Sequence, residues 1–413
     1  MTPFNAGNPE DCQEKKLPPR DWILLPLISL LTIGLLAGST ELIARRMFSR
    51  TGTLYDCLVL NDPSTGTRGI PGCVSREKIE ETQPVEYRFN SSGYRAETEF
   101  GPKSPGTYRI VMVGSSFAMG YRVPVEETFA ARLQAELSQR TGLRTELFNE
   151  AMAGSGGSPR SVSLRFKDAL AAKPDLILWI LTFWDVSHVS SIMPEETPAG
   201  HETSIGRTRR LVKEALARKS IVEMVRDLSD VPLKVVRVRW EMTRTAFLLQ
   251  HFLNESQSQY LRAYLIGSDS NNGFLKTEPS AEWQTWLRQS DSYAEELQAR
   301  AAAAGVPLVA VLVPDRAQAA LISMGAWPAD IDPFKLDDEL RAMIVRHGGI
   351  YIDILSGFRN IPNPEHYYFP VDGHPNAEGQ RIISRLLAEA LTGGAIPALK
   401  VAAQSPAAKD PDR

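Results

Sequence analysis

Residues 109–120 read RIVMVGSSFAMG, and this stretch decides the fold. Its first five residues form a short, β-branched apolar run that ends at Gly114, which is the pattern of a strand buried on both faces. A helical pattern follows, with Phe129, Leu133 and Leu137 spaced by four residues along one face. A strand that leads through a tight turn into a helix indicates an α/β arrangement.

The same alternation repeats along the chain. Further strand-like runs lie at 147–149, 176–182, 308–313 and 350–353, and helical patterns lie between most of them. The last helical pattern covers 376–391. Strands that alternate with helices predict a parallel sheet with helices on both faces. Ligands of such sheets bind beyond the carboxyl ends of the strands, so the residues that follow each strand are the functional candidates.

The composition is that of an ordinary globular protein. Of the 413 residues, 43% are hydrophobic and 23% are charged, which is enough apolar material for a sizeable core. The formal net charge is −3 and the pI is near 6.2. Because the chain has no global basic field, we expect no nucleic-acid partner.

An uncharged apolar run, WILLPLISLLTIGLLAGST, covers residues 22–40. A helix of about this length crosses the hydrocarbon core of a bilayer. We therefore predict a transmembrane helix over 22–44, preceded by a polar, proline-interrupted cytoplasmic leader over 1–21. A cleaved signal peptide is the alternative, since the small residues at 37–39 suit a peptidase. The long leader and the long apolar run favour the anchor.

The basic residues around this run do not orient it, because three precede it and three follow it. Cysteine usage is more informative. Cys57 and Cys73 lie close together after the run, whereas Cys12 lies alone before it. If the main domain is exported, the first two can form a disulfide, although three unrelated buried thiols remain the alternative. We expect a single-pass protein of the inner (cell) membrane with its main domain on the periplasmic side.

The rest of the chain divides by composition. Residues 45–104 are rich in Gly, Pro, Ser and Thr, and they predict a stalk or N-terminal extension that packs on the main domain. We expect the main domain over 105–395, with a helical insertion over 187–292, and a disordered tail over 396–413. Residues 207–244 of the insertion hold 11 Lys or Arg against 5 Asp or Glu. They are either solvated helix faces or a lid or surface for anionic lipid or glycan.

Two loops carry the candidate chemistry. Ser116 lies on a Gly-flanked turn between the first strand and a helix, where backbone N–H groups are able to hold an oxyanion. Asp372 lies two residues before His374, in a loop that precedes the last helix. Such a carboxylate can hold Nδ1–H of the histidine and leave Nε2 to take a proton from a serine, which is a poor nucleophile without a base. Each loop alone is also typical of an ordinary turn.

Taken in order, these motifs resemble those of the SGNH (GDSL-like) hydrolase family. The matching blocks are GSSFAMG at 114–120, NEAMAG at 149–154 and DGHPNAEGQ at 372–380, with further similarity in RFNSSGYR at 88–95, VPVEETF at 123–129 and LVPDRAQ at 312–318. The resemblance covers residues 85–186 and 295–392 and leaves the insertion unmatched. It implies a flavodoxin-like three-layer α/β/α sandwich with about five parallel strands, to which the transmembrane helix and the helical insertion are added.

The resemblance also implies roles for single residues. Ser116 would be the nucleophile, His374 the general base and then acid, and Asp372 the carboxylate that orients the histidine. The backbone N–H groups of Ser116 and Gly154 would hold the oxyanion, and Asn149 would start the second block. No cofactor is implied, and no spacing of His, Cys or carboxylates indicates a metal site.

The chain departs from the family's pattern at two positions. Trp184 stands where the third block has an asparagine that donates to the oxyanion, and an indole N–H donates from a different point. Loss of one such donor typically costs about 10²–10³ in rate. Ser115 replaces an aspartate that helps to hold the first turn, and Ser115 is also a minor alternative nucleophile. Asp185 is expected either as a site residue or as a capping residue after the third strand.

These residues predict a serine esterase that forms an acyl-enzyme. Family and location together indicate an O-acylated, often O-acetylated, envelope or exported glycan as the substrate. One alternative is an O-acyltransferase that works with polysaccharide-assembly machinery. Another is a degenerate domain that binds glycan or acts as a scaffold. The last alternative is a lipid esterase or lysophospholipase, which the anchor and the basic insertion favour.

Overall fold

The structure is a computed structural model that describes residues 18, 20–189 and 243–400. In this part of the chain, parallel strands form a five-stranded central sheet: β5 (Thr107–Val113), β6 (Arg144–Asn149), β7 (Leu176–Leu181), β8 (Leu308–Leu312) and β9 (Ile350–Tyr351). The strand order is β6-β5-β7-β8-β9, which is the flavodoxin-like order. The predicted α/β class and its parallel sheet are therefore confirmed.

The central strands are apolar along their whole length because both faces of the sheet are covered. Every residue of β7 and β8 is buried. At the edge, β6 begins three residues before the apolar run that predicted it, with Arg144, Thr145 and Glu146. An edge strand has one neighbour and tolerates polar side chains, so its apolar pattern is shorter than the strand itself.

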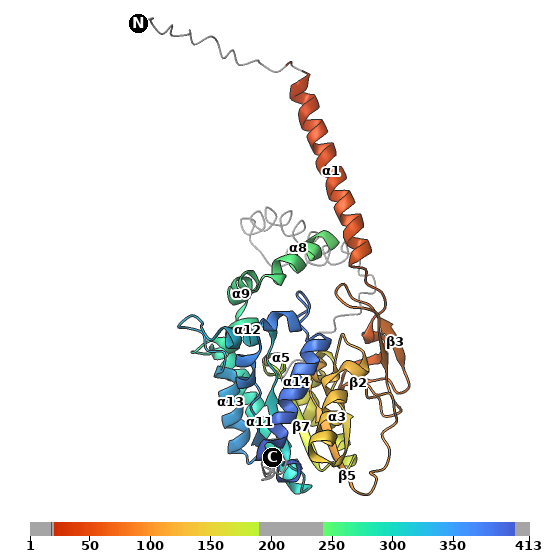
Figure 1. Cartoon of the computed structure of the whole chain (residues 1–413), viewed down its shortest axis with the longest axis vertical. Helices are drawn as coiled ribbons and strands as arrows, with labels where there is room; N and C mark the ends of the chain where they lie inside the picture. The colour runs from red at the N-terminus through yellow and green to blue at the C-terminus, as the bar shows by residue number, and fades with distance from the viewer. Residues whose placement is uncertain (1–17, 19, 190–242, 401–413) are drawn as a thin grey trace, which may run out of the picture.

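Helices cover both faces of the sheet (Figure 1). The first layer contains α3 (Phe129–Thr141) and α14 (Ala377–Ala390), which pack against each other. In the second layer, α11 (Ala281–Ala303) packs against α4 (Pro159–Ala171) and α13 (Lys335–Arg346). Parallel strands joined by right-handed crossovers place successive helices on the two faces in this way.

Three helices begin directly after strands, at the carboxyl edge of the sheet. They are α2 (Ser116–Met119), α5 (Phe183–Ser187) and α12 (Arg316–Met324). The remaining short turns are η1 (Leu54–Cys57), η2 (Val125–Glu127), η3 (Gly154–Gly157), η4 (Gly273–Leu275), η5 (Ser356–Asn360), η6 (Pro364–Tyr367), the π-type η7 (Leu391–Ala395) and η8 (Pro397–Leu399).

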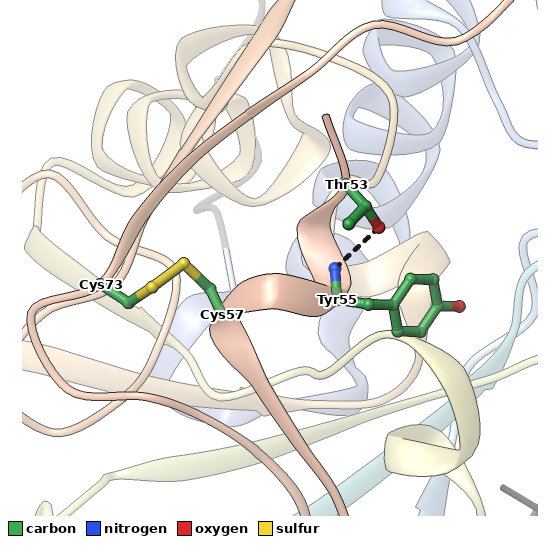
Figure 2. The surroundings of a disulfide bond; sticks show 4 residues. All are labelled: Thr53, Tyr55, Cys57 and Cys73. Carbon is green, nitrogen blue, oxygen red and sulfur yellow. Dashed lines mark hydrogen bonds between the residues drawn. A yellow bond between two sulfur atoms is a disulfide. The ribbon is translucent and has the colours of Figure 1, made fainter. Parts of the chain in front are cut away.

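The N-terminal extension forms two antiparallel hairpins. The first pairs β1 (Leu58–Asp62) with β2 (Gly66–Gly69), and the second pairs β3 (Val74–Glu77) with β4 (Val85–Arg88). A disulfide between Cys57 and Cys73 joins the two hairpins (Figure 2). Next to it, Thr53 caps η1 by accepting the N–H of Tyr55 at 3.1 Å.

The extension and the sheet share one hydrophobic core. Leu54, Tyr87 and Phe89 of the extension belong to the same buried cluster as the central strands. Arg165 of α4 donates to the carbonyl of Thr67 at 2.7 Å and adds a polar tie. The extension is therefore packed on the main domain and is not a free stalk.

Helix α1 (Asp21–Met47) projects from the rest of the chain (Figure 1). It is long and apolar enough to cross a membrane, and its most apolar window has no buried residue. Length and composition alone do not separate an anchor from a signal sequence.

The predicted insertion is described only in part, since residues 190–242, and with them most of the basic segment 207–244, lie outside the described residues. The described part begins with α8 (Arg244–Glu255), α9 (Gln257–Leu265) and α10 (Asp269–Asn272). In Figure 1, α8 lies beside the lower end of α1, and α9 leads from it toward α12. Helix α11, which starts inside the predicted insertion, belongs to the layer that covers the sheet.

Candidate active site

The turn after β5 presents Ser116 at the carboxyl edge of the sheet. Ser116 begins α2, and Ser115 is its N-cap. The turn passes so close to β7 that a Cβ on Gly114 would lie 2.7 Å from the carbonyl oxygen of Ile180. Glycine is therefore required there, because any side chain would push the turn that carries Ser116 away from the sheet.

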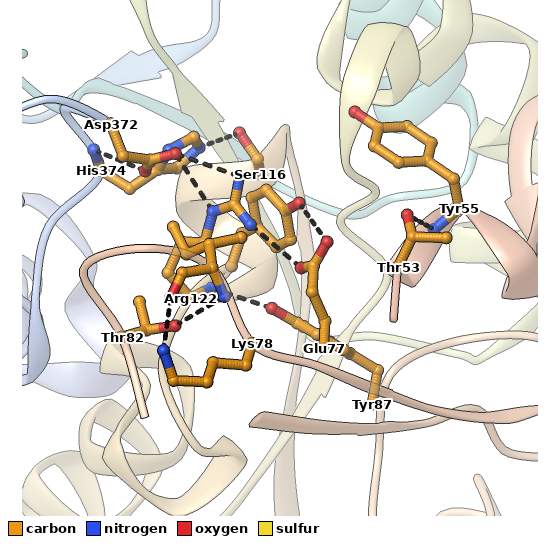
Figure 3. A network of polar contacts seen from close by, with 12 residues as sticks. Thr53, Tyr55, Glu77, Lys78, Thr82, Tyr87, Ser116, Arg122, Asp372 and His374 are labelled. Atoms are coloured by element: carbon orange, nitrogen blue, oxygen red, sulfur yellow. Dashed lines mark hydrogen bonds and ion pairs between the residues drawn. The ribbon is translucent and has the colours of Figure 1, made fainter. Parts of the chain in front are cut away.

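The structure brings the three predicted catalytic residues together (Figure 3). Ser116 Oγ lies 2.8 Å from His374 Nε2, and His374 Nδ1 lies 2.6 Å from Asp372 Oδ1. The imidazole packs between the rings of Phe117 and Tyr121, whose centroids lie 5.0 and 5.3 Å away. This is the geometry in which a histidine accepts the serine proton while a carboxylate holds its other nitrogen protonated.

The carboxylate of Asp372 stays ionised. Burial disfavours its charged form, but attraction and hydrogen bonding from His374, together with the guanidinium of Arg122, outweigh this cost. They hold the pKa of Asp372 well below its usual range. An ionised Asp372 keeps the proton on Nδ1 of His374 and leaves Nε2 free to act as the base.

The sequence pattern did not reveal a second polar layer behind Asp372. Arg122 Nε donates to Asp372 Oδ2 at 3.1 Å, and Arg122 Nη1 donates to Glu77 Oε2 at 3.0 Å (Figure 3). The guanidinium also stacks on Tyr121, 3.8 Å from the ring centroid. Arg122 has a φ of 78°, in the region that side chains other than glycine rarely adopt. The strained backbone conformation thus occurs at the residue whose side chain holds Asp372.

Glu81 of the extension fastens the loop that carries Asp372. Its side chain is 2% exposed and accepts the backbone N–H groups of Val371 at 3.0 Å and of Asp372 at 2.9 Å. It also lies 2.8 Å from Nδ1 of His251 on α8. Glu77 and Glu81 thus connect the extension to the triad, and no local motif in the sequence indicated either of them.

Asp185 serves as a capping residue and does not line the cavity beside the triad. Its Oδ2 accepts the N–H and Oγ1–H of Thr182 at 2.9 and 2.7 Å, which completes a capping box at α5. It also accepts Ser115 Oγ–H at 3.1 Å. Burial raises the pKa of Asp185 to about 6, although these hydrogen bonds act to lower it. Because Ser115 bonds Asp185 while Ser116 faces His374, the geometry favours Ser116 as the nucleophile.

The second block has a structural role at the neighbouring strand end. Asn149 Nδ2 donates to the carbonyl of Ala118 at 2.8 Å, and its Oδ1 accepts the N–H of Ala151 at 3.1 Å. These bonds tie the exit of β6 to α2. Gly154 follows in a turn with a φ of 64°, and it is not among the residues that line the cavity beside the triad.

A cavity of about 570 Å³ opens beside the triad. Trp184 lines it with 38% of its surface exposed, and its ring stacks on His188 at a centroid distance of 3.9 Å. Helices α8 and α9 contribute amide and aromatic side chains to the lining, namely Gln250, Asn254, Tyr260 and Tyr264. Aromatic faces and amides therefore surround the nucleophile.

Arg316, from the predicted fourth-strand exit, closes the far wall of the cavity. It stacks on Tyr260 at 4.0 Å and donates to the carbonyl of Pro370 at 2.7 Å. Asp315 beside it accepts the hydroxyl of Tyr264 at 2.5 Å, and burial raises the pKa of Asp315 to about 6. Across the described ranges, no three His, Cys, Asp or Glu side chains are grouped as metal ligands would be.

No protein-family profile matches the sequence, and no curated protein matches it. Several solved structures are similar in chain course. An acetylxylan esterase from Geobacillus stearothermophilus has 9% identity and a TM-score of 0.37, with 69% of this chain and 94% of that chain covered. A lipolytic protein of the G-D-S-L family from Veillonella parvula has 14% identity and a TM-score of 0.33, with 69% and 98% covered.

A lipase/acylhydrolase from Enterococcus faecalis has 11% identity and a TM-score of 0.32, with 69% of this chain and 96% of that chain covered. The structural neighbours of this chain thus include GDSL lipolytic proteins, acylhydrolases and esterases. Their similarity is too low to assign an activity, which rests on Ser116, Asp372 and His374 in this chain.

Proposed function

We propose that this chain is a serine esterase of the SGNH (GDSL-like) type, anchored in the membrane by α1. The observation that carries the proposal is the contact of 2.8 Å between Ser116 Oγ and His374 Nε2, with Asp372 on the other nitrogen of the ring. The three residues lie in the blocks that resemble the family, and their side chains form the arrangement that activates a serine hydroxyl.

The mechanism is a two-step acyl transfer. Ser116 Oγ loses its proton to His374 and attacks the ester carbonyl, which forms a tetrahedral oxyanion. The backbone N–H groups of Ser116 and Gly154 are the proposed oxyanion donors, and within the described residues neither donates to a backbone carbonyl. His374 protonates the leaving alcohol. It then deprotonates a water molecule that attacks the acyl-enzyme and releases the acid.

The proposed substrate is an O-acyl group on an envelope or exported glycan. The cavity supports this choice, because Trp184, Tyr260 and Tyr264 offer aromatic faces and Gln250 and Asn254 offer amides. Aromatic faces pack on the apolar faces of sugar rings, and amides exchange hydrogen bonds with hydroxyl groups.

We place the catalytic domain on the periplasmic side of the inner membrane. The Cys57–Cys73 disulfide supports this side, because disulfides persist in oxidising compartments. Protease added to spheroplasts should digest the domain without lysis. Protection of the domain until lysis would contradict this orientation.

Active-site labelling tests the enzyme assignment. The full-length protein in detergent is treated with a serine-reactive phosphonate, alongside Ser116→Ala and the matched control Ser292→Ala, whose side chain lies on the surface of α11. We expect the parent and Ser292→Ala to be labelled and Ser116→Ala to remain unlabelled. Equal labelling of all three would overturn the role of Ser116. Absence of label on all three would favour the degenerate glycan-binding domain.

Transfer to an acceptor sugar is the second candidate. The cavity of about 570 Å³ is larger than a small acyl group needs, so it has room for an acceptor beside the ester. With an acetyl donor, hydrolysis releases acetate whether or not a sugar is present. Acetate release only in the absence of the acceptor, with an acetylated sugar in its presence, would favour transfer.

A further inference from the structure

Helix α8 presents an apolar face to solvent. Leu249, Phe252 and Leu253 are 52%, 56% and 45% exposed. Their spacing of three and four residues places them on one side of the helix. Exposed apolar residues that gather on one helix face, beside a helix long enough to span a membrane, call for an occupant of that face.

The start of α8 is fixed at the point where the apolar run of α1 ends. Glu41, the first charged residue after that run, accepts the backbone N–H groups of Arg244 at 3.2 Å and Thr245 at 2.9 Å. It also accepts Thr245 Oγ1–H at 2.8 Å. A carboxylate at a helix N-terminus satisfies its free N–H groups and complements its dipole, so this junction holds the two helices together.

Aromatic packing continues the junction. The ring of Phe48, just after α1, lies 5.3 Å from that of Phe247 and 5.2 Å from that of His251. His251 in turn contacts Glu81, which holds the backbone of Asp372. A continuous chain of contacts therefore runs from the end of α1 through α8 to the triad loop.

Exposed basic residues lie in the last turn of α1 and just after it. They are Arg45, Arg46 and Arg50. The stretch from the end of the apolar run to the last of them has the number of residues of about three helical turns. Basic side chains at the end of a membrane span lie among lipid headgroups and phosphates. Because Glu41 is bonded to the first turn of α8, this helix starts at the level of α1 where the apolar run ends and these basic side chains begin.

A neighbouring side of α8 lines the cavity. Gln250 and Asn254 belong to the cavity wall, and Asn254 Nδ2 donates to the carbonyl of Pro370 at 3.0 Å. Helix α8 thus has side chains on the cavity and, separately, exposed apolar side chains, and it starts beside the lower end of α1 (Figure 1).

We infer that α8 lies in the headgroup region of the bilayer that α1 crosses, with Leu249, Phe252 and Leu253 inserted. The triad cavity then opens beside the membrane and takes acylated molecules held at its surface. This inference rests on the membrane anchoring in the proposed function. Burial of apolar surface stabilises membrane binding by about 0.8 kcal/mol per CH₂ group. Three such side chains are therefore sufficient to hold a tethered helix at the interface.

Quenching by lipids tests the inference on the full-length chain. Cys12→Ser provides the background, and single cysteines at Phe252→Cys, Leu31→Cys and Val345→Cys carry a bimane label. Val345 is a matched control, because it is 57% exposed and ends α13 at the edge of the sheet away from the triad. The protein is reconstituted in vesicles of phosphatidylethanolamine and phosphatidylglycerol that contain doxyl lipids.

We expect strong quenching at Leu31 and Phe252 and none at Val345, with Phe252 quenched more by a shallow doxyl group than by a deep one. Quenching at Leu31 without quenching at Phe252 would overturn the inference and leave the anchor intact. The apolar face of α8 would then be assigned to residues 190–242 or to a second copy of the chain. No quenching at Leu31 would overturn the anchor and the inference with it. Neither result depends on the activity of Ser116.

A kinetic test uses side chains outside the catalytic machinery. The double variant Phe252→Glu/Leu253→Glu should keep the rate on a soluble para-nitrophenyl ester. It should lose about 10-fold on a fluorogenic acyl ester embedded in vesicles, whereas Val345→Glu should change neither rate. Equal rates on the embedded ester for the parent and the double variant would overturn the inference.

Discussion

Arg122 Nε donates to Asp372 Oδ2 at 3.1 Å, the carboxylate oxygen that His374 does not use. The two oxygens of Asp372 are thus divided between the base and a guanidinium that is itself held by the buried carboxylate of Glu77. A carboxylate fixed through both oxygens cannot rotate away from the imidazole, so the geometry of the triad depends on a residue outside it.

The first prediction concerns Arg122→Ala. Loss of the guanidinium frees Asp372 to move, and we expect kcat to fall by up to about 10²-fold with little change in KM. Because Arg122 helps to lower the pKa of Asp372, the acid limb of the pH–rate profile should shift to higher pH. Arg122→Lys should restore part of both effects. A fall in kcat with an unmoved pH profile would mean that Arg122 serves only folding.

Asp372→Asn tests the orienting carboxylate. An amide can stabilise the wrong tautomer of His374 and cannot stabilise the imidazolium, so kcat should fall by about 10⁴-fold. The folded state should survive, since the side chain keeps its shape. Steady-state kinetics together with circular dichroism would separate the two properties. A loss below 10-fold would contradict the triad.

Trp184→Asn tests the departure from the family's pattern. The indole lines the cavity at the start of α5, where an asparagine amide could donate to the oxyanion. We expect kcat on a small acetyl ester to rise by at least 10-fold, and by no more than the roughly 10²–10³ that one donor typically contributes. KM for an acylated oligosaccharide should rise because an aromatic wall is lost. An unchanged kcat would show that this position does not reach the oxyanion.

The disulfide variant Cys57→Ser/Cys73→Ser tests the stability of the extension. The two cysteines are separated by 16 residues. Closing a loop of this size stabilises a fold by about 3 kcal/mol through the unfolded chain. The melting temperature of the variant in detergent should fall by several degrees. Mass analysis of the exported parent under non-reducing conditions should find the two cysteines linked, and two free thiols there would contradict the proposed orientation.

Glu150→Gln tests a buried carboxyl beneath the sheet edge. Burial raises the pKa of Glu150 to about 8, despite the attraction of Arg165. As the pH rises from 4.5 to about 8, the unfolded chain releases this proton and the folded chain retains it, so folding stability is lost over that window. The stabilising effect of the variant should therefore be larger at pH 8 than at pH 5. Thermal unfolding of both proteins at pH 5 and pH 8 measures this difference. An equal change in the melting temperature of the parent and the variant between the two pH values would contradict the prediction.

Much of the fold follows from local pattern. Short apolar runs predicted all five strands of the sheet. The runs are longest in the central strands β7 and β8, which are buried on both faces. The strand-like piece at 85–89 corresponds to β4. The hairpin of β1 and β2 was not predicted, because neither LVLND at 58–62 nor GTRG at 66–69 alternates between apolar and polar residues.

The sequence by itself determined the α/β class and the apolar N-terminal helix, because each depends on side chains that are near neighbours along the chain. It predicted Ser116, Asp372 and His374 through short motifs that resemble those of the SGNH (GDSL-like) family. Only the tertiary structure decided what surrounds them: Arg122 and the carboxylates Glu77 and Glu81 behind Asp372, and the capping role of Asp185. Arg122 and Asp372 are 250 positions apart. Arg122 follows α2 and Asp372 precedes α14, and both segments lie at the carboxyl edge of the sheet. Such contacts between distant segments follow from the tertiary packing, which no local periodicity records.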